Sequence, residues 1–108
     1  MFARLFGAGL PTSDFQKTQD ALTRADCVVI DVREAAEFRS GHVPGSRNMP
    51  LSRFDPSALP PDKSVILLCL SGVRSARAVR QARAAGRSDV SHYPGGVAGW
   101  RRSGGVLA

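Results

Sequence analysis

Cysteines, aromatic residues and long apolar runs are all scarce in this sequence. Two cysteines among 108 residues are too few for a fold that depends on disulfides. Aromatic residues make up 6% of the chain, and they are not interleaved with basic residues as in proteins that stack nucleic-acid bases. The apolar runs are much shorter than the roughly 20 residues that cross a membrane. These shortages argue against a disulfide scaffold, a single-stranded nucleic-acid binder and a membrane-spanning protein.

Acidic residues are also in the minority, with 9 against 15 basic residues and a formal net charge of +6. The basic residues are scattered along the chain, which favours solvated arginine-rich faces over a nucleic-acid interface. Such a charge still suits small anionic substrates or acidic partner proteins. The apolar segment 1–11 lacks the long core and cleavage pattern of a secretory signal. We therefore interpret it as an N-terminal extension and expect a cytoplasmic protein with no nucleic-acid or membrane partner.

The length of the chain suits one compact domain with a real core. Short apolar runs predict buried strands at 27–31 and 65–69, and a last short strand is expected near 89–93. Helical patterns cover 12–25, 33–41 and 74–86, with a short terminal helix that carries Trp100 as a core residue. Because strands alternate with helices, we expect an α/β fold whose central, mostly parallel sheet is flanked by helices on both faces.

Two local features refine this outline. Ser13 is followed three residues later by Gln16, so Ser13 is expected to cap the first helix. Cys27 opens its strand whereas Cys69 closes a parallel one. Four residues of strand span about 13 Å, far more than the roughly 6 Å that a disulfide tolerates between Cα atoms. We expect no disulfide, and we interpret Cys27 as a packing residue.

Cys69 stands where ligands usually bind in a parallel sheet, at the carboxyl end of the most apolar strand. A short loop follows it, and Arg74 and Ser75 are expected to open the next helix. Gly72 can supply the positive φ that such a loop needs. Backbone N–H groups, the helix start and the Arg74 charge should all stabilise a thiolate. The predicted anion cradle consists of Leu70, Ser71, Gly72, Val73, Arg74 and Ser75.

The segment CLSGVRSA, which begins at Cys69, resembles the active-site loop of rhodanese-like domains. The segment VVIDVREAAEFRSGHVPGSRNMPL at 28–51 resembles the first signature of this family, and YPGGVAGW at 93–100 resembles its terminal signature. The three segments also match the family in order and spacing. The resemblance therefore implies a single rhodanese-like domain, which we place at residues 12–108.

Membership of this family implies a sulfurtransferase. The Cys69 thiolate would take a sulfane sulfur from thiosulfate or a persulfide, become a persulfide itself, and pass the sulfur to cyanide or a thiol. Donor and acceptor could be small molecules or proteins, and no metal or organic cofactor is implied. The second loop position, often basic or polar in the family, is Leu70 here. This departure disfavours thiosulfate and favours a protein or low-molecular-weight persulfide donor.

The resemblance also assigns supporting positions. Asp31 and Arg33 match a D-x-R pattern and are expected to form an ion-paired brace rather than to react. His42, in the segment GHVPG, is interpreted as a structural residue rather than a catalytic base. His92 falls near the end of the last strand, a position from which a side chain can face the pocket.

Three alternatives stay open at this point. Cysteine phosphatases and arsenate reductases of related fold place five residues between cysteine and arginine, whereas four separate Cys69 from Arg74. A cysteine hydrolase would need His42 or His92 within hydrogen-bond reach of the sulfur. The third alternative is a non-catalytic rhodanese-like binding module. No oligomeric state follows from the sequence.

Overall fold

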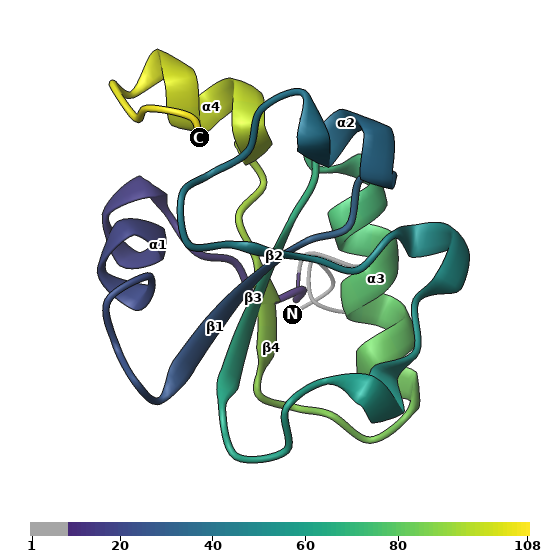
Figure 1. Cartoon of the computed structure of the whole chain (residues 1–108). Coiled ribbons are helices and arrows are strands. Elements are labelled where there is room, and N and C mark those ends of the chain that lie inside the picture. The colour runs from purple at the N-terminus through teal and green to yellow at the C-terminus, as the bar shows by residue number, and fades with distance from the viewer. Residues whose placement is uncertain (1–8) are drawn as a thin grey trace.

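A computed structural model describes residues 9–108, and it confirms the α/β class (Figure 1). Four strands form one sheet in the order β2-β1-β3-β4, and every neighbouring pair is parallel. The strands are β1 (Cys27–Asp31), β2 (Arg47–Asn48), β3 (Ser64–Leu68) and β4 (Val90–His92). Because all of them run the same way, their carboxyl ends meet at one edge of the sheet.

Helices cover both faces of this sheet, as expected. The helices are α1 (Phe15–Ala21), α2 (Ala35–Arg39), α3 (Val73–Ala84) and α4 (Gly96–Arg102), and two short 3-10 turns lie at Leu51–Arg53 and Pro56–Ala58. Helix α3 lies on one face, α1 and α4 lie on the other, and α2 lies near the carboxyl ends of the strands (Figure 1).

The two faces bury separate apolar clusters because successive strand residues point to opposite sides. Leu67 packs with Ala78 and Val79 of α3, whereas Leu68 packs with Val97 and Trp100 near α1 and α4. Every residue from 65 to 69 is buried. This explains why β3 reads as a continuous apolar run rather than an alternating one.

Two helix starts differ from the expectation by one residue. Asp14, not Ser13, caps α1, since its carboxylate accepts a hydrogen bond from the Lys17 N–H at 2.8 Å. The Ser13 hydroxyl instead forms a buried hydrogen bond with the Thr18 hydroxyl. Helix α3 begins at Val73 rather than at Arg74, because the left-handed backbone of Gly72 already completes the turn.

The amino-terminal boundary stays a prediction. Residues 1–8 of the proposed extension 1–11 lie outside the described part of the chain. Thr12, the first residue of the proposed domain, forms a parallel bridge with His92. Within residues 9–108, the helices are all too short or too polar to cross a membrane.

Candidate active site

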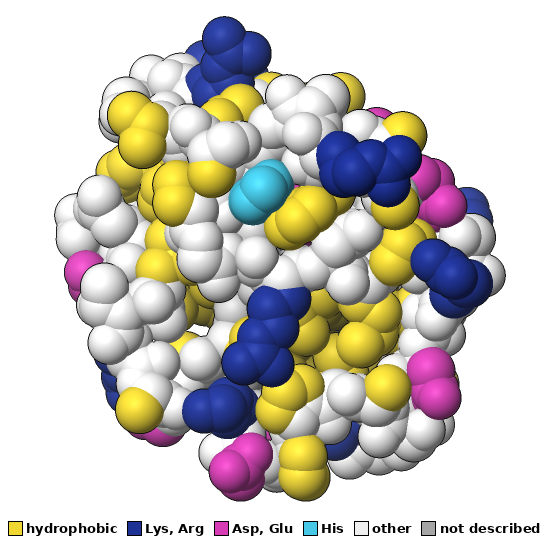
Figure 2. Space-filling model, viewed as in Figure 1, with side chains coloured by type: hydrophobic (Ala, Val, Ile, Leu, Met, Phe, Trp, Pro, Cys, Tyr) yellow, Lys and Arg dark blue, Asp and Glu magenta, His cyan; other side chains and the backbone are white. Residues whose placement is uncertain are grey.

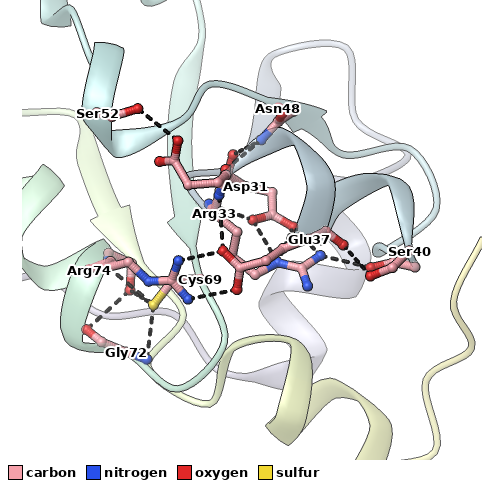
Figure 3. Close-up of polar contacts among 12 residues, drawn as sticks. Asp31, Arg33, Glu37, Ser40, Asn48, Ser52, Cys69, Gly72 and Arg74 are labelled. Atoms are coloured by element: carbon pink, nitrogen blue, oxygen red, sulfur yellow. Dashed lines mark hydrogen bonds and ion pairs between the residues drawn. The ribbon is translucent and has the colours of Figure 1, made fainter.

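Cys69 is the first residue after β3, and its sulfur lies inside the loop that leads into α3 (Figure 3). The sulfur accepts the Gly72 N–H at 3.1 Å and the Ser75 N–H at 3.4 Å. The Ser75 hydroxyl lies 3.6 Å from it. Only 1% of Cys69 is exposed. The sulfur is therefore surrounded by polar hydrogens in a site that largely excludes water.

Burial and hydrogen bonding act in opposite directions on this thiol. Burial is the largest single influence and raises the pKa of Cys69. The backbone and hydroxyl of Ser75, followed by the backbone groups of Gly72 and Ser71, lower that pKa. Together they outweigh burial, so the pKa of Cys69 falls below its ordinary value. The loop thus favours a thiolate at a place where an apolar pocket would favour a thiol.

The backbone of Gly72 gives the loop its shape. Its φ is +102°, and a Cβ at this position would lie 2.7 Å from the Pro94 carbonyl oxygen. A larger residue would carry both backbone strain and a clash with main-chain atoms. Only glycine leaves the Gly72 N–H pointing at the sulfur with Pro94 behind it.

The loop is also held from the side of α4. The Val97 N–H donates to the Cys69 carbonyl at 2.9 Å, and the Ala98 N–H donates to the Leu70 carbonyl at 3.1 Å. Gly96 allows this close approach, because a Cβ there would lie 2.5 Å from the Cys69 carbonyl oxygen. These bonds fix the orientation of the peptide groups that follow Cys69. The terminal glycine-rich segment is therefore part of the site.

Arg74 is paired with Glu37, a partner that the sequence analysis did not predict, and its charge still interacts with Cys69. Its guanidinium forms two hydrogen bonds with the Glu37 carboxylate, at 2.7 and 3.1 Å. Figure 3 shows the two side chains pointing toward one another, from α3 and α2. Glu37 is the largest influence that raises the pKa of Arg74, and Arg74 in turn lowers the pKa of Glu37. Sequence reasoning missed Glu37.

Asp31 and Arg33 form an ion pair beneath the site. The Arg33 guanidinium donates to both Asp31 oxygens, with a shortest distance of 2.8 Å, and also to the Gly41 carbonyl. The side chains are 6% and 0% exposed for Arg33 and Asp31. Asn48, which sequence reasoning also missed, donates its amide to the carbonyls of Asp31 and Arg33. Arg33 thereby ties the end of β1 to the segment after α2, and Asn48 ties it to β2.

The two histidines have different surroundings. His42 stacks on Phe38 and places its Nδ1 2.9 Å from the Phe38 carbonyl oxygen, so it belongs to the end of α2. His92 is buried, and its Nδ1 lies 2.8 Å from the Ser75 hydroxyl, which in turn neighbours the sulfur of Cys69. His92 reaches the sulfur only through Ser75. This geometry does not meet the requirement of a cysteine hydrolase for a histidine bonded to the nucleophile.

The outer side of the loop is partly apolar. Leu70 is 45% exposed and Val73 is 74% exposed. Figure 2 shows the hydrophobic, basic and acidic side chains intermingled on the face of the molecule seen in Figure 1. The loop therefore exposes two apolar side chains to solvent, while the nearby Arg74 is paired with Glu37.

Cys27 lies far from this loop. It pairs with Ser64 at the start of β3, whereas Cys69 follows the last residue of that strand. Both cysteines are free, so the expected absence of a disulfide between them agrees with the structure. Trp100 is buried as expected, and its indole N–H donates to the Val106 carbonyl.

Known proteins resemble the chain along most of its length. The profile of the rhodanese-like domain matches residues 14–103. An uncharacterised Synechocystis protein, slr1261, is 40% identical over 91 residues, which cover 82% of this chain and 51% of that protein. A protein of Allochromatium vinosum named sulfurtransferase is 31% identical over 81 residues, covering 73% of this chain and 76% of that one. This chain thus spans about half the length of the first of these relatives.

A crystal structure agrees in fold. The rhodanese-related protein of Thermoplasma volcanium superposes with a TM-score of 0.80 at 27% identity. The superposition covers 91% of this chain and 97% of that one. The parallel sheet and its flanking helices are therefore shared with a solved structure.

Proposed function

The chain belongs to the rhodanese-like domain family, and on this premise we propose that it is a sulfurtransferase which carries a sulfane sulfur on Cys69. The observation that carries the proposal is the set of hydrogen bonds from Gly72 and Ser75 to the Cys69 sulfur. They lower the pKa of the thiol despite its burial. A nucleophile that is already ionised needs no general base for the attack.

The reaction proceeds in two displacements. The Cys69 thiolate attacks the outer sulfur of a donor, the S–S bond of the donor breaks, and sulfite or a thiolate leaves with the electron pair. Cys69 now carries a persulfide, whose negative outer sulfur is stabilised by the loop N–H groups. An acceptor such as cyanide or a thiolate attacks that outer sulfur. The new S–S bond breaks, and the Cys69 thiolate is regenerated.

A persulfide is the donor that the loop favours over thiosulfate. Thiosulfate is a dianion and needs cationic partners. Arg74 is neutralised by Glu37, and the exposed loop side chains Leu70 and Val73 offer dispersion but no charge. A persulfide carries a single negative charge at its reacting end and can place its organic part against these side chains. This difference in charge and shape supports a persulfide as the donor.

A cysteine phosphatase is the main competing function. It needs an anion cradle large enough for a phosphoryl group and an arginine that is free to bind its oxygens. The loop has four residues between Cys69 and Arg74, and Arg74 is paired with Glu37. Both features favour transfer of a single sulfur atom.

Mass spectrometry of the intact protein tests the proposal. Incubation with glutathione persulfide should add one sulfur to Cys69, and cyanide should remove it with formation of thiocyanate. The Cys69→Ser variant should accept no sulfur, whereas Cys27→Ser should behave like the parent. Hydrolysis of an aryl phosphate by the parent protein would favour the phosphatase, and a folded protein without either activity would favour a binding module.

A further inference from the structure

The Ser75 hydroxyl occupies a buried position between three polar neighbours. It lies 3.6 Å from the Cys69 sulfur, 2.8 Å from Nδ1 of His92 and 3.3 Å from the Gly72 carbonyl oxygen. Ser75, Cys69 and His92 are 0%, 1% and 5% exposed. A hydroxyl has one proton and can donate it to one neighbour at a time. The Ser75 hydroxyl must therefore choose one of these neighbours as the acceptor of its proton, and this fixes the direction of the O–H bond.

The protonation of Nδ1 decides that direction. When His92 carries its proton on Nδ1, the ring donates to the Ser75 oxygen, and the hydroxyl proton is free to point at the sulfur. When Nδ1 is bare, it attracts the hydroxyl proton, and the Ser75 oxygen turns its lone pairs toward the sulfur. The first arrangement stabilises a Cys69 thiolate by a charge-assisted hydrogen bond. The second suits a Cys69 thiol, which then donates to Ser75.

The surroundings keep the imidazole neutral, so only one of its nitrogens carries a proton. Burial is the larger cause that lowers the pKa of His92, and the charge of Arg80 on α3 lowers it further. The charged group beside Cys69 is Arg74, which is paired with Glu37. With no second ring proton, the partner of Nδ1 selects the tautomer.

We infer that His92 is a positioning residue, which donates from Nδ1 to Ser75 and thereby turns the Ser75 hydroxyl proton onto the Cys69 sulfur. Ionisation of Cys69 and the tautomer of His92 then change together. The sulfur proton passes to the Ser75 oxygen, the Ser75 proton passes to Nδ1, and the proton on Nε2 leaves to water. One proton is released, and no net charge remains on the ring. The inference rests on the proposed function only in that the thiolate is the working form.

A double-mutant cycle tests the chain of bonds. All variants carry Cys27→Ser, so that iodoacetamide reports on Cys69 alone, and rates are measured as a function of pH. Ser75→Ala and His92→Phe should each raise the pKa of Cys69 and slow alkylation below that pKa by about fivefold. The double variant should be no slower than Ser75→Ala. Additive losses, or no loss in His92→Phe, would overturn the inference.

Conservative variants separate the hydrogen bond from packing. The amide nitrogen of His92→Asn can reach the position of Nδ1, whereas that of His92→Gln reaches the position of Nε2. Asparagine should therefore keep much of the alkylation rate that phenylalanine loses, and glutamine should not. His42→Phe is the matched control on the other histidine and should leave the pKa of Cys69 unchanged. Equal losses of alkylation rate in the three His92 variants would indicate that only packing matters, and they would overturn the inference.

Nitrogen-15 NMR of the imidazole shows which ring nitrogen of His92 carries the proton. It uses the unsubstituted protein, so it tests the inference even if a variant fails to fold. His92 should carry its proton on Nδ1 while Cys69 is a thiolate, and on Nε2 once Cys69 is protonated. A ring protonated on Nε2 beside the thiolate would contradict the inference. These measurements need no sulfur donor. A failure of sulfur transfer and a failure of this hydrogen-bond chain are therefore distinguishable.

Discussion

The two cysteines of this protein lie at opposite ends of adjacent strands and experience opposite environments. Cys27 is half-buried at the amino end of β1, and Cys69 is almost completely buried beyond the carboxyl end of β3. Burial, followed by a hydrogen bond with the Asp26 carboxylate, raises the pKa of Cys27. The more deeply buried Cys69 has the lowered pKa. Burial alone therefore does not set thiol reactivity here; the groups aimed at the sulfur do.

A large cavity and the hydrogen bonds to the Cys69 sulfur lie at opposite ends of the sheet. A cavity of about 470 Å³ lies at the amino end of the sheet and includes Cys27 and Asp89 in its lining. Within the described residues, no N–H group of a loop or helix start donates to the Cys27 sulfur, whereas the Cys69 sulfur accepts two such hydrogen bonds. We therefore place the proposed chemistry at the end with the hydrogen-bond donors, because a sulfur anion needs hydrogen bonds more than space.

The pH dependence of alkylation gives the largest expected difference between the two ends. In Cys27→Ser, the alkylation of Cys69 should reach its plateau below the pKa of a free thiol, about 8.5, and should decline only as the pH falls through the lowered pKa. In Cys69→Ser, alkylation of Cys27 should still be rising at more alkaline pH. Rates with iodoacetamide across the pH range check this order. Coincident midpoints would remove the contrast.

Gly72→Ala should damage the Cys69 end by moving the amide that faces the sulfur. We expect sulfur uptake to fall by about tenfold or more, the pKa of Cys69 to rise, and stability to drop by about 1–3 kcal/mol from backbone strain and the clash with Pro94. Gly86→Ala is the matched control. Gly86 also has a positive φ, +95°, but nothing lies within 4 Å of a Cβ there.

The control variant should lose about 1 kcal/mol of stability with no change in alkylation of Cys69. Thermal unfolding and alkylation rates are measured on both variants. Equal effects of Gly72→Ala and Gly86→Ala on the thiol would mean that the loop amide is unimportant.

The smallest expected effect concerns the charge of the loop. Leu70→Arg adds a cation near the sulfur. Glu37→Gln removes the negative charge that pairs with Arg74. It keeps a side-chain oxygen that can accept the hydrogen bond from the Glu34 N–H at the start of α2. Each should raise kcat/KM for thiosulfate several-fold, corresponding to about 1 kcal/mol, because the groups are partly exposed. The gain should shrink with added salt.

Leu70→Gln serves as the uncharged control for the loop, and an uncharged donor should gain little in any of these variants. If kcat/KM for thiosulfate at low salt stays unchanged in both Leu70→Arg and Glu37→Gln, the account of donor preference fails.

Local patterns were sufficient to predict strands β1, β3 and β4, the two-sided helical cover and the loop after Cys69, but not the two-residue edge strand β2. They act over a few residues, where periodicity and glycine placement determine the backbone. Contacts between distant segments were not predictable. Glu37 meets Arg74 from 37 positions away, and His92 meets Ser75 from 17. Such pairs depend on how α2 and β4 pack against the start of α3. The error at Ser13 is of another kind, since Asp14 competes for the same capping position.

The hydrogen bonds from α4 to the loop link two segments that are distant in sequence. To swing away from the sulfur, the loop must release the N–H groups of Val97 and Ala98. Because these N–H groups belong to the first turn of α4 and have no acceptor within the helix, opening of the loop would leave them unpaired, and we expect the two amides to exchange together. If Cys69 carries the sulfur that we propose, slow opening of this loop would protect the persulfide from attack by other thiols between the donor and the acceptor.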